Sequence, residues 1–120
     1  RDSKDKERVK LVLEIIEKFV SQRTEIGEFT VEHILPDSEG EKNAHIGNLI
    51  PLEKNLNEKC KAKALEKKCV YYKQSSFYTA RGIVNRYSGK TFDVTARTKH
   101  LAKMIYNNIL ELNQLYYLDK

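Results

Sequence analysis

Two short β-rich segments among longer helical ones are the feature that most constrains the fold. Residues 29–35 alternate along the chain, with Phe29, Val31, His33 and Leu35 on one face, and Pro36 ends the segment. A second short extended segment covers residues 46–50 and ends at Pro51. We therefore expect a fold of the α+β class, in which a small two-stranded hairpin has a helix across it and packs among further helices.

The remaining segments have helical periodicity. Residues 5–22 carry an apolar face, residues 53–68 are good helix formers without Gly or Pro, and residues 76–86 form a shorter apolar face. Asp93 or Thr95 would cap a last helix. We expect a polar loop at residues 37–43 and a turn at residues 88–90. We expect one domain over residues 1–120, with an N-terminal helix at 5–22, a central core at 28–68 and C-terminal helices at 76–114.

Composition excludes several classes of protein. No apolar run approaches the roughly 18 residues of a membrane span, and the charged N-terminus lacks the apolar region of a signal peptide. Cys60 and Cys69 are too few for a disulfide framework or a structural zinc site, so we expect reduced thiols in a cytoplasmic protein. The 22 Lys and Arg exceed the 17 Asp and Glu, which gives a net charge of +5. This basic excess lies in the second half and leaves two readings open, a nucleic-acid partner or a merely solvated surface.

One set of residues has the types that phosphodiester hydrolysis requires. Glu32 and His33 lie in the first strand, Asn48 in the second, and Asn57 in the basic helix that follows. Carboxylate and amide oxygens bind hard divalent cations, a neutral imidazole can deprotonate water near pH 7, and lysines attract phosphates. Neighbouring strand residues point to opposite faces, so Glu32 and His33 share a site only if the strand bends or the site wraps its end, as Pro36 would permit.

These motifs resemble a known family. Residues 32–36 (EHILP), residues 46–49 (IGNL) and Asn57 resemble the ββα-metal fold of HNH endonucleases, and more narrowly the C-terminal HNH domain of GmrSD-type modification-dependent restriction and phage-defence proteins. The resemblance covers residues 28–110 and makes residues 28–68 the ββα core. It implies a metal-dependent DNA endonuclease, a nickase or double-strand cutter, in bacterial defence against phage or foreign DNA. It also implies an upstream ParB-like nucleotide-hydrolysing domain, and the missing initiator Met is expected of a piece of a longer protein.

The resemblance also implies a role for each residue. His33 would activate the water, and Asn48 would brace the loop and orient that base. Glu32 and Asn57 would hold Mg²⁺ or Mn²⁺, with Asn55 as a rival to Asn57. An Asn where many HNH proteins have their last His favours this oxygen-rich site over zinc. The residues expected to contact nucleic acid are Lys59, Lys61, Lys68 and Arg97.

Each of these residues also has a plainer reading. His33 would be a hydrogen-bonded structural histidine, Glu32 a solvent-facing strand residue, Asn48 a turn residue and Asn57 a helix cap. The lysine run at 59–68 would be a solvated face. The corresponding alternative function is a catalytically inactive nucleic-acid-binding or protein-interaction domain.

Overall fold

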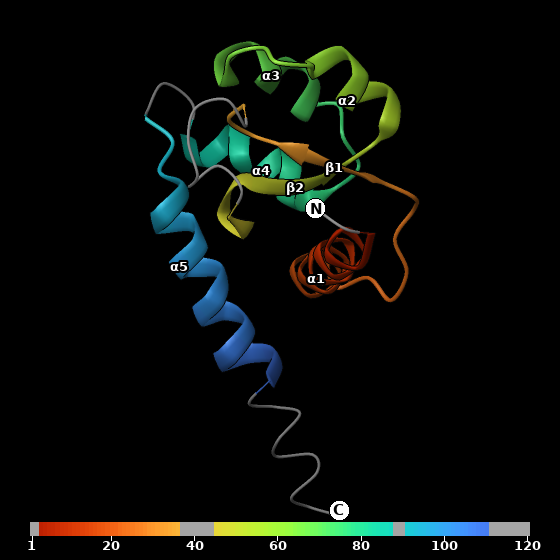
Figure 1. Ribbon diagram of the computed structural model, residues 1–120, viewed down its shortest axis with the longest axis vertical. Helices are drawn as coiled ribbons and strands as arrows, with labels where there is room; N and C mark the ends of the chain where they lie inside the picture. The colour runs from red at the N-terminus through yellow and green to blue at the C-terminus, as the bar shows by residue number, and fades with distance from the viewer. Residues whose placement is uncertain (1–2, 37–44, 88–90, 111–120) are drawn as a thin grey trace, which may run out of the picture.

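A two-stranded antiparallel hairpin lies between helices in the computed structural model, which describes residues 3–36, 45–87 and 91–110. Helix α1 lies on one side of the hairpin, and α2 and α3 lie on the other side (Figure 1). This arrangement confirms the expected α+β class. The elements are α1 (Ser3–Ser21), β1 (Thr30–His33), the 3₁₀ helix η3 (Ile46–Asn48), β2 (Leu49–Leu52), α2 (Lys54–Cys60), α3 (Leu65–Tyr72), α4 (Tyr78–Tyr87), α5 (Val94–Met104) and the π-helical η4 (Ile105–Leu110).

The second strand differs from the prediction because Pro51 lies inside it. The backbone N–H of Ile34 donates to the Asn48 carbonyl at 2.8 Å, which continues the ladder beyond β1. Because hydrogen-bonded and non-hydrogen-bonded pairs alternate in an antiparallel ladder, the pair of Val31 and Pro51 is a non-hydrogen-bonded one. The N–H that proline lacks is therefore not needed there. The register pairs Thr30 with Leu52, Val31 with Pro51, Glu32 with Ile50 and His33 with Leu49.

The two faces of β1 differ in burial. The alternation is confirmed, but the more buried face contains Glu32 and Ile34, whereas Val31, His33 and Leu35 are only half-buried. The glutamate of the Glu-His pair therefore points into the core.

The prediction of one helix over residues 53–68 is wrong, because Lys61 separates α2 from α3. Its φ of 45° ends α2, and the N–H of Lys63 bonds to the Cys60 carbonyl at 3.0 Å. Asn57 and Lys68 both contact β1. In one straight helix these residues would lie about 16 Å apart along the axis, whereas β1 itself extends over only about 10 Å. The break lets α3 turn back over the strand.

Two carboxylates bind the free N–H groups at the starts of helices, and one of them also links α1 to α4. Glu17 of α1 is fully buried and accepts hydrogen bonds from the N–H of Tyr78 at 2.7 Å and the N–H of Thr79 at 3.0 Å, at the start of α4. Asp93 accepts a hydrogen bond from the N–H of Ala96 at 3.0 Å, which confirms the predicted cap of the last helix. Helix α1 likewise confirms the predicted N-terminal helix.

Some predictions fall outside the described residues. The polar loop at 37–43, the turn at 88–90 and the last helix beyond residue 110 are among them. Within the described ranges, no helix combines the length and the apolar character that crossing a membrane requires.

Candidate functional site

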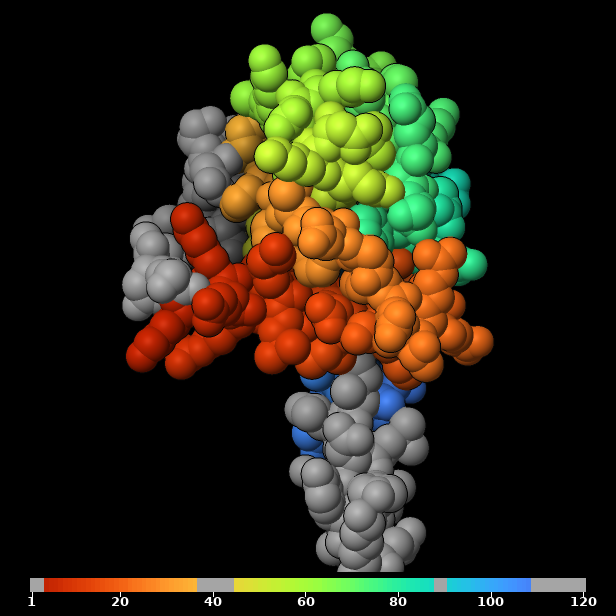
Figure 2. Space-filling model, turned by 90° about the vertical axis from the view of Figure 1, so that its right-hand side faces the viewer, coloured from red at the N-terminus to blue at the C-terminus, as the bar shows by residue number. Residues whose placement is uncertain are grey.

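His33 is the last residue of β1, at the end of the hairpin where the chain enters the segment that connects β1 to β2. Its side chain is half-buried, on the opposite face from Glu32. Figure 2 shows the segment that carries β1, in orange, between α1 in red and α2 in yellow-green. The end of β1 that carries His33 is contacted by α3, through Lys68, whereas α2 contacts the other end of the strand through Asn57.

Asn48 holds the segment that follows His33. Its side chain is fully buried, its Oδ1 accepts from the N–H of Leu35 at 2.8 Å, and its Nδ2 donates to the Leu35 carbonyl at 2.8 Å. Two bonds from one planar amide fix both the position and the rotation of the Leu35 backbone. Asn48 therefore holds the backbone two residues after His33, although its own side chain is buried.

Arg97 of α5 holds the other strand. Its guanidinium donates to the carbonyls of Gly47 at 2.9 Å and of Leu49 at 3.1 Å, and Leu49 is the partner of His33 in the hairpin. Burial lowers the pKa of Arg97 to about 10, so the group stays charged at neutral pH. The structure differs here from the predicted phosphate contact, because the Arg97 side chain is 7% exposed and its donors are directed at backbone.

Lys68 and Glu32 form a buried ion pair beside His33. The Lys68 Nζ lies 3.2 Å from Oε2 of Glu32, and it donates to the carbonyls of His33 at 2.5 Å and Ile34 at 3.2 Å. The hydroxyl of Tyr72 donates to the same Oε2 at 2.6 Å. Burial and the nearby charge of Glu32 raise the pKa of the Tyr72 hydroxyl, so it remains a donor. Lys68 is 1% exposed, so the structure places it in the core and not among surface cations.

The predicted metal ligands do not fit an ion as they are arranged here. Glu32 is 3% exposed and its Oε2 is bound to Lys68 and Tyr72, so the negative charge is already balanced by a cation. The Nδ2 of Asn57 donates to Oγ1 of Thr30 at 2.8 Å and to the Val31 carbonyl at 3.2 Å. Across the residues that the structure describes, no group of three or more His, Cys, Asp or Glu side chains could hold a metal ion.

The other predicted residues lie at the surface of α2 and just beyond it. Lys59, Lys61 and the alternative ligand Asn55 are exposed. His33, Asn48, Glu32, Lys68 and Arg97 are brought together around one end of the hairpin. The exposed lysines belong to the helix that packs beside it.

Sequence reasoning missed the partnership of Lys68, Glu32 and Tyr72. A signal was present, because Lys68 and Tyr72 are four residues apart and share one face of a helix with Leu65, so that a charged residue occupies a core position. Thr98 was also missed. Its Oγ1 accepts from the N–H of Gly47 at 3.0 Å and donates to the Val94 carbonyl at 2.8 Å.

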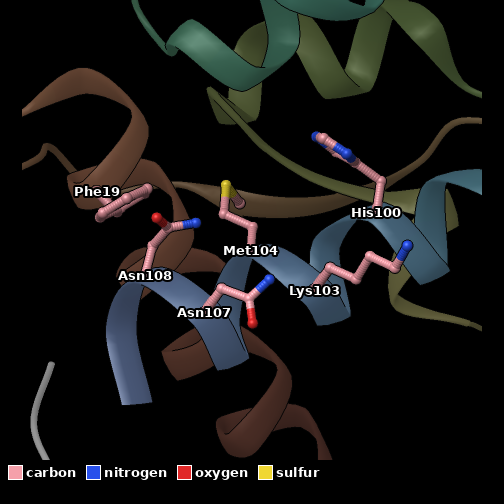
Figure 3. A pocket seen from close by; sticks show the side chains of 6 residues that line it. All are labelled: Phe19, His100, Lys103, Met104, Asn107 and Asn108. Carbon is pink, nitrogen blue, oxygen red and sulfur yellow. The ribbon is translucent and has the colours of Figure 1, made fainter. Parts of the chain in front are cut away.

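A separate cavity of about 320 Å³ lies between α1 and the α5–η4 helix (Figure 3). None of the predicted site residues lines it, so it is distinct from the site at the hairpin. Its lining residues are Phe19, His100, Lys103, Met104, Asn107 and Asn108.

Comparison with known proteins agrees with the motif at the hairpin. No curated protein and no solved structure gives a significant match to the chain. A family model described as GmrSD restriction endonucleases, C-terminal domain, matches residues 1–104. This match confirms the resemblance and gives the chain a nuclease role related to restriction. Nucleases of this type generally depend on a metal ion. The chain belongs to the family of the C-terminal domain of GmrSD restriction endonucleases.

Proposed function

We propose that the chain is an HNH-type DNA endonuclease in which His33 activates the attacking water. The observation that supports this most is the position of His33, half-buried at a strand end around which side chains from η3, α3 and α5 hold the backbone of both chain segments. A neutral imidazole suits this task near pH 7. The water oxygen attacks phosphorus, His33 takes the water proton, and the bond from phosphorus to the leaving oxygen breaks.

Asn48 would keep His33 oriented during this step. Its two bonds to Leu35 hold the chain immediately after the base, and a base that is displaced by 1 Å loses much of its catalytic effect. Asn48 would therefore act through His33, without touching DNA.

The predicted Mg²⁺ or Mn²⁺ would neutralise charge on the phosphoryl group. Glu32 and Asn57 stay the predicted ligands, but the ion pair of Glu32 with Lys68 argues against Glu32 in this arrangement. The affinity of the Glu32→Gln and Asn57→Ala variants for Mn²⁺, measured by electron paramagnetic resonance, tests each predicted ligand independently of nuclease activity.

DNA would bind across the exposed lysines of the α2 region. Lys59 and Lys61 are exposed, and ammonium groups near a duplex gain affinity by releasing counterions from phosphates. Defence against phage or foreign DNA, the choice between nicking and cutting both strands, and a ParB-like domain upstream belong to this proposal as predictions from the family resemblance.

The test is nicking of supercoiled plasmid with Mg²⁺ or Mn²⁺. His33→Ala should abolish nicking, while His100→Ala, which removes an exposed imidazole on α5, should cut like the native chain. Equal rates for the native chain and His33→Ala would refute the catalytic role. Full activity in excess chelator would refute the metal dependence.

The second candidate is a nucleic-acid-binding domain without turnover. The burial of Glu32 favours it, because the acidic neighbour of His33 does not reach solvent. It predicts salt-sensitive DNA binding, with no cleavage under any divalent ion.

A further inference from the structure

We propose that Lys68 is a positioning residue for His33, with Glu32 as the counter-ion of the buried ammonium. The proposal rests on the proposed catalytic role of His33. It assigns to Lys68 and Glu32 roles other than phosphate contact and metal binding.

The ammonium of Lys68 has a full set of acceptors. A lysine carries three N–H donors, and three acceptors lie within 3.2 Å of Nζ: the carbonyls of His33 and Ile34 and the Glu32 carboxylate. A lysine this deeply buried is costly unless its charge and donors are satisfied. Two of the three donors of the ammonium bind consecutive backbone carbonyls, and the first of these belongs to His33.

Glu32 makes the buried cation tolerable. Its Oε2 accepts from Tyr72 at 2.6 Å and lies 3.2 Å from the ammonium, so α3 holds the carboxylate through two side chains. Glu32 and His33 are neighbours on a strand and point to opposite faces. The glutamate can therefore anchor the buried face of the strand end while His33 projects from the other.

The opposite strand is held in the same way. Arg97 donates to the carbonyls of Gly47 and Leu49, and Leu49 pairs with His33. Lys68 thus binds the backbone of one strand and Arg97 that of the other, on the two sides of the pair formed by His33 and Leu49. With the Asn48 bonds to Leu35, the backbone from His33 through Leu35 is held by side chains at every residue.

Burial separates this role from phosphate contact. Lys68 is 1% exposed, so a phosphate could reach its ammonium only by displacing Glu32 or the two carbonyls. A phosphate-contacting lysine changes mainly DNA affinity and its salt dependence. A positioning lysine changes mainly kcat, through the orientation of the base.

The experiment compares Lys68→Met/Glu32→Gln with Lys67→Met in the full chain. The double variant removes both charges, so that it leaves no unpaired buried ion. Lys67 is the exposed neighbour on α3, and its variant is the matched control. Two quantities are measured: kcat and KM for plasmid nicking, and the His33 ring resonances in a long-range ¹H–¹⁵N NMR spectrum. The resonances of His45 and His100, both exposed, are internal references.

We expect the double variant to lower kcat at least tenfold with KM within twofold, and to shift the His33 ring signals while the other two histidines stay in place. Lys67→Met should leave kcat and the three sets of signals unchanged. A folded double variant with native kcat and native His33 signals would overturn the proposal. So would a raised KM with native kcat, which is the result for a phosphate contact.

If the double variant does not fold, Glu32→Gln alone provides a second test of the proposal. It leaves the buried ammonium of Lys68 without its counter-ion, so kcat should fall and the His33 ring signals should shift as in the double variant, while Mn²⁺ affinity should be unchanged. Loss of Mn²⁺ binding together with a kcat more than a hundredfold lower would make Glu32 a ligand and overturn its role as counter-ion. Native nicking by His33→Ala would refute the proposed function instead, and the His33 ring signals would still report whether Lys68 positions that residue.

Discussion

Replacing Gly47 by Ala should destabilise the protein by about 3 kcal/mol or more, whereas the same replacement at Gly82 should stabilise it. A Cβ on Gly47 would lie 2.5 Å from the backbone nitrogen of Thr98, and closer still to the Val94 carbonyl and the Thr98 hydroxyl. Two of these atoms are backbone, so no rotamer change relieves the clash, and α5 would have to move away by about 1 Å.

The magnitude follows from what that movement would break. Overpacking of a close contact costs about 1–3 kcal/mol. Moving α5 would also stretch the bonds from Arg97 to the Gly47 and Leu49 carbonyls, now 2.9 and 3.1 Å, and hydrogen bonds to charged groups contribute about 1.5–3 kcal/mol. The two effects together give about 3 kcal/mol or more, and the same displacement would reach Asn48 and lower nicking.

Gly82 provides the matched control. It lies within α4, and a Cβ there would meet nothing within 4 Å. Alanine in a helix is more stable than glycine by about 0.5–1 kcal/mol. Urea unfolding of both variants, monitored by circular dichroism, measures the difference. A Gly47→Ala variant within 0.5 kcal/mol of the native chain would refute the close approach of α5 to η3.

Three further predictions concern residues of α2, its end and the segment before it. Burial alone would raise the pKa of the Glu53 carboxylate, but hydrogen bonds from Ser76 and Ser75 outweigh burial and lower it. The ionised carboxylate should therefore stabilise the folded protein fully above the unfolded pKa of 4.5, and this stabilisation should be lost as pH falls below that value. Glu53→Gln should accordingly reduce the acid sensitivity of unfolding between pH 5.5 and 3.5. Lys61→Gly should raise the free energy of unfolding by about 1 kcal/mol, since glycine adopts a positive φ without strain, and should lower the salt dependence of DNA binding by about one phosphate contact. Burial and the charge of Glu32 raise the pKa of the Cys60 thiol to about 12, so iodoacetamide at pH 8 should modify Cys60 only after unfolding, as peptide mass spectrometry would report.

The sequence pattern within one or two helical turns was enough to predict helix α1 and the start of helix α5. The apolar periodicity of residues 5–22 gives α1, and Asp93 begins α5 by binding an N–H three residues ahead. Both depend on interactions within one or two helical turns, which sequence spacing expresses directly.

The departures depend on contacts between distant segments. Nothing in residues 53–68 opposes one continuous helix, yet the chain breaks at Lys61 because α2 and α3 must both reach β1. Pro51 was expected to end the second strand, but the register places it at a pair that needs no N–H. Register and packing are set by the partner segment, which local propensity does not contain.

The same limit applies to the Glu-His motif. Adjacent strand residues must face opposite sides, and the motif alone does not say which side is the core. That is decided by α3, whose Lys68 and Tyr72 reach Glu32 only because the chain turns at Lys61. A helix that continued straight would leave the Glu32 carboxylate without its cation, and an unpaired carboxylate on the strand would be a better metal ligand than a buried, neutralised one. The chemistry open to Glu32 therefore depends on a backbone break almost thirty residues away, and the variants of Glu32, Lys61 and Lys68 address one connected arrangement.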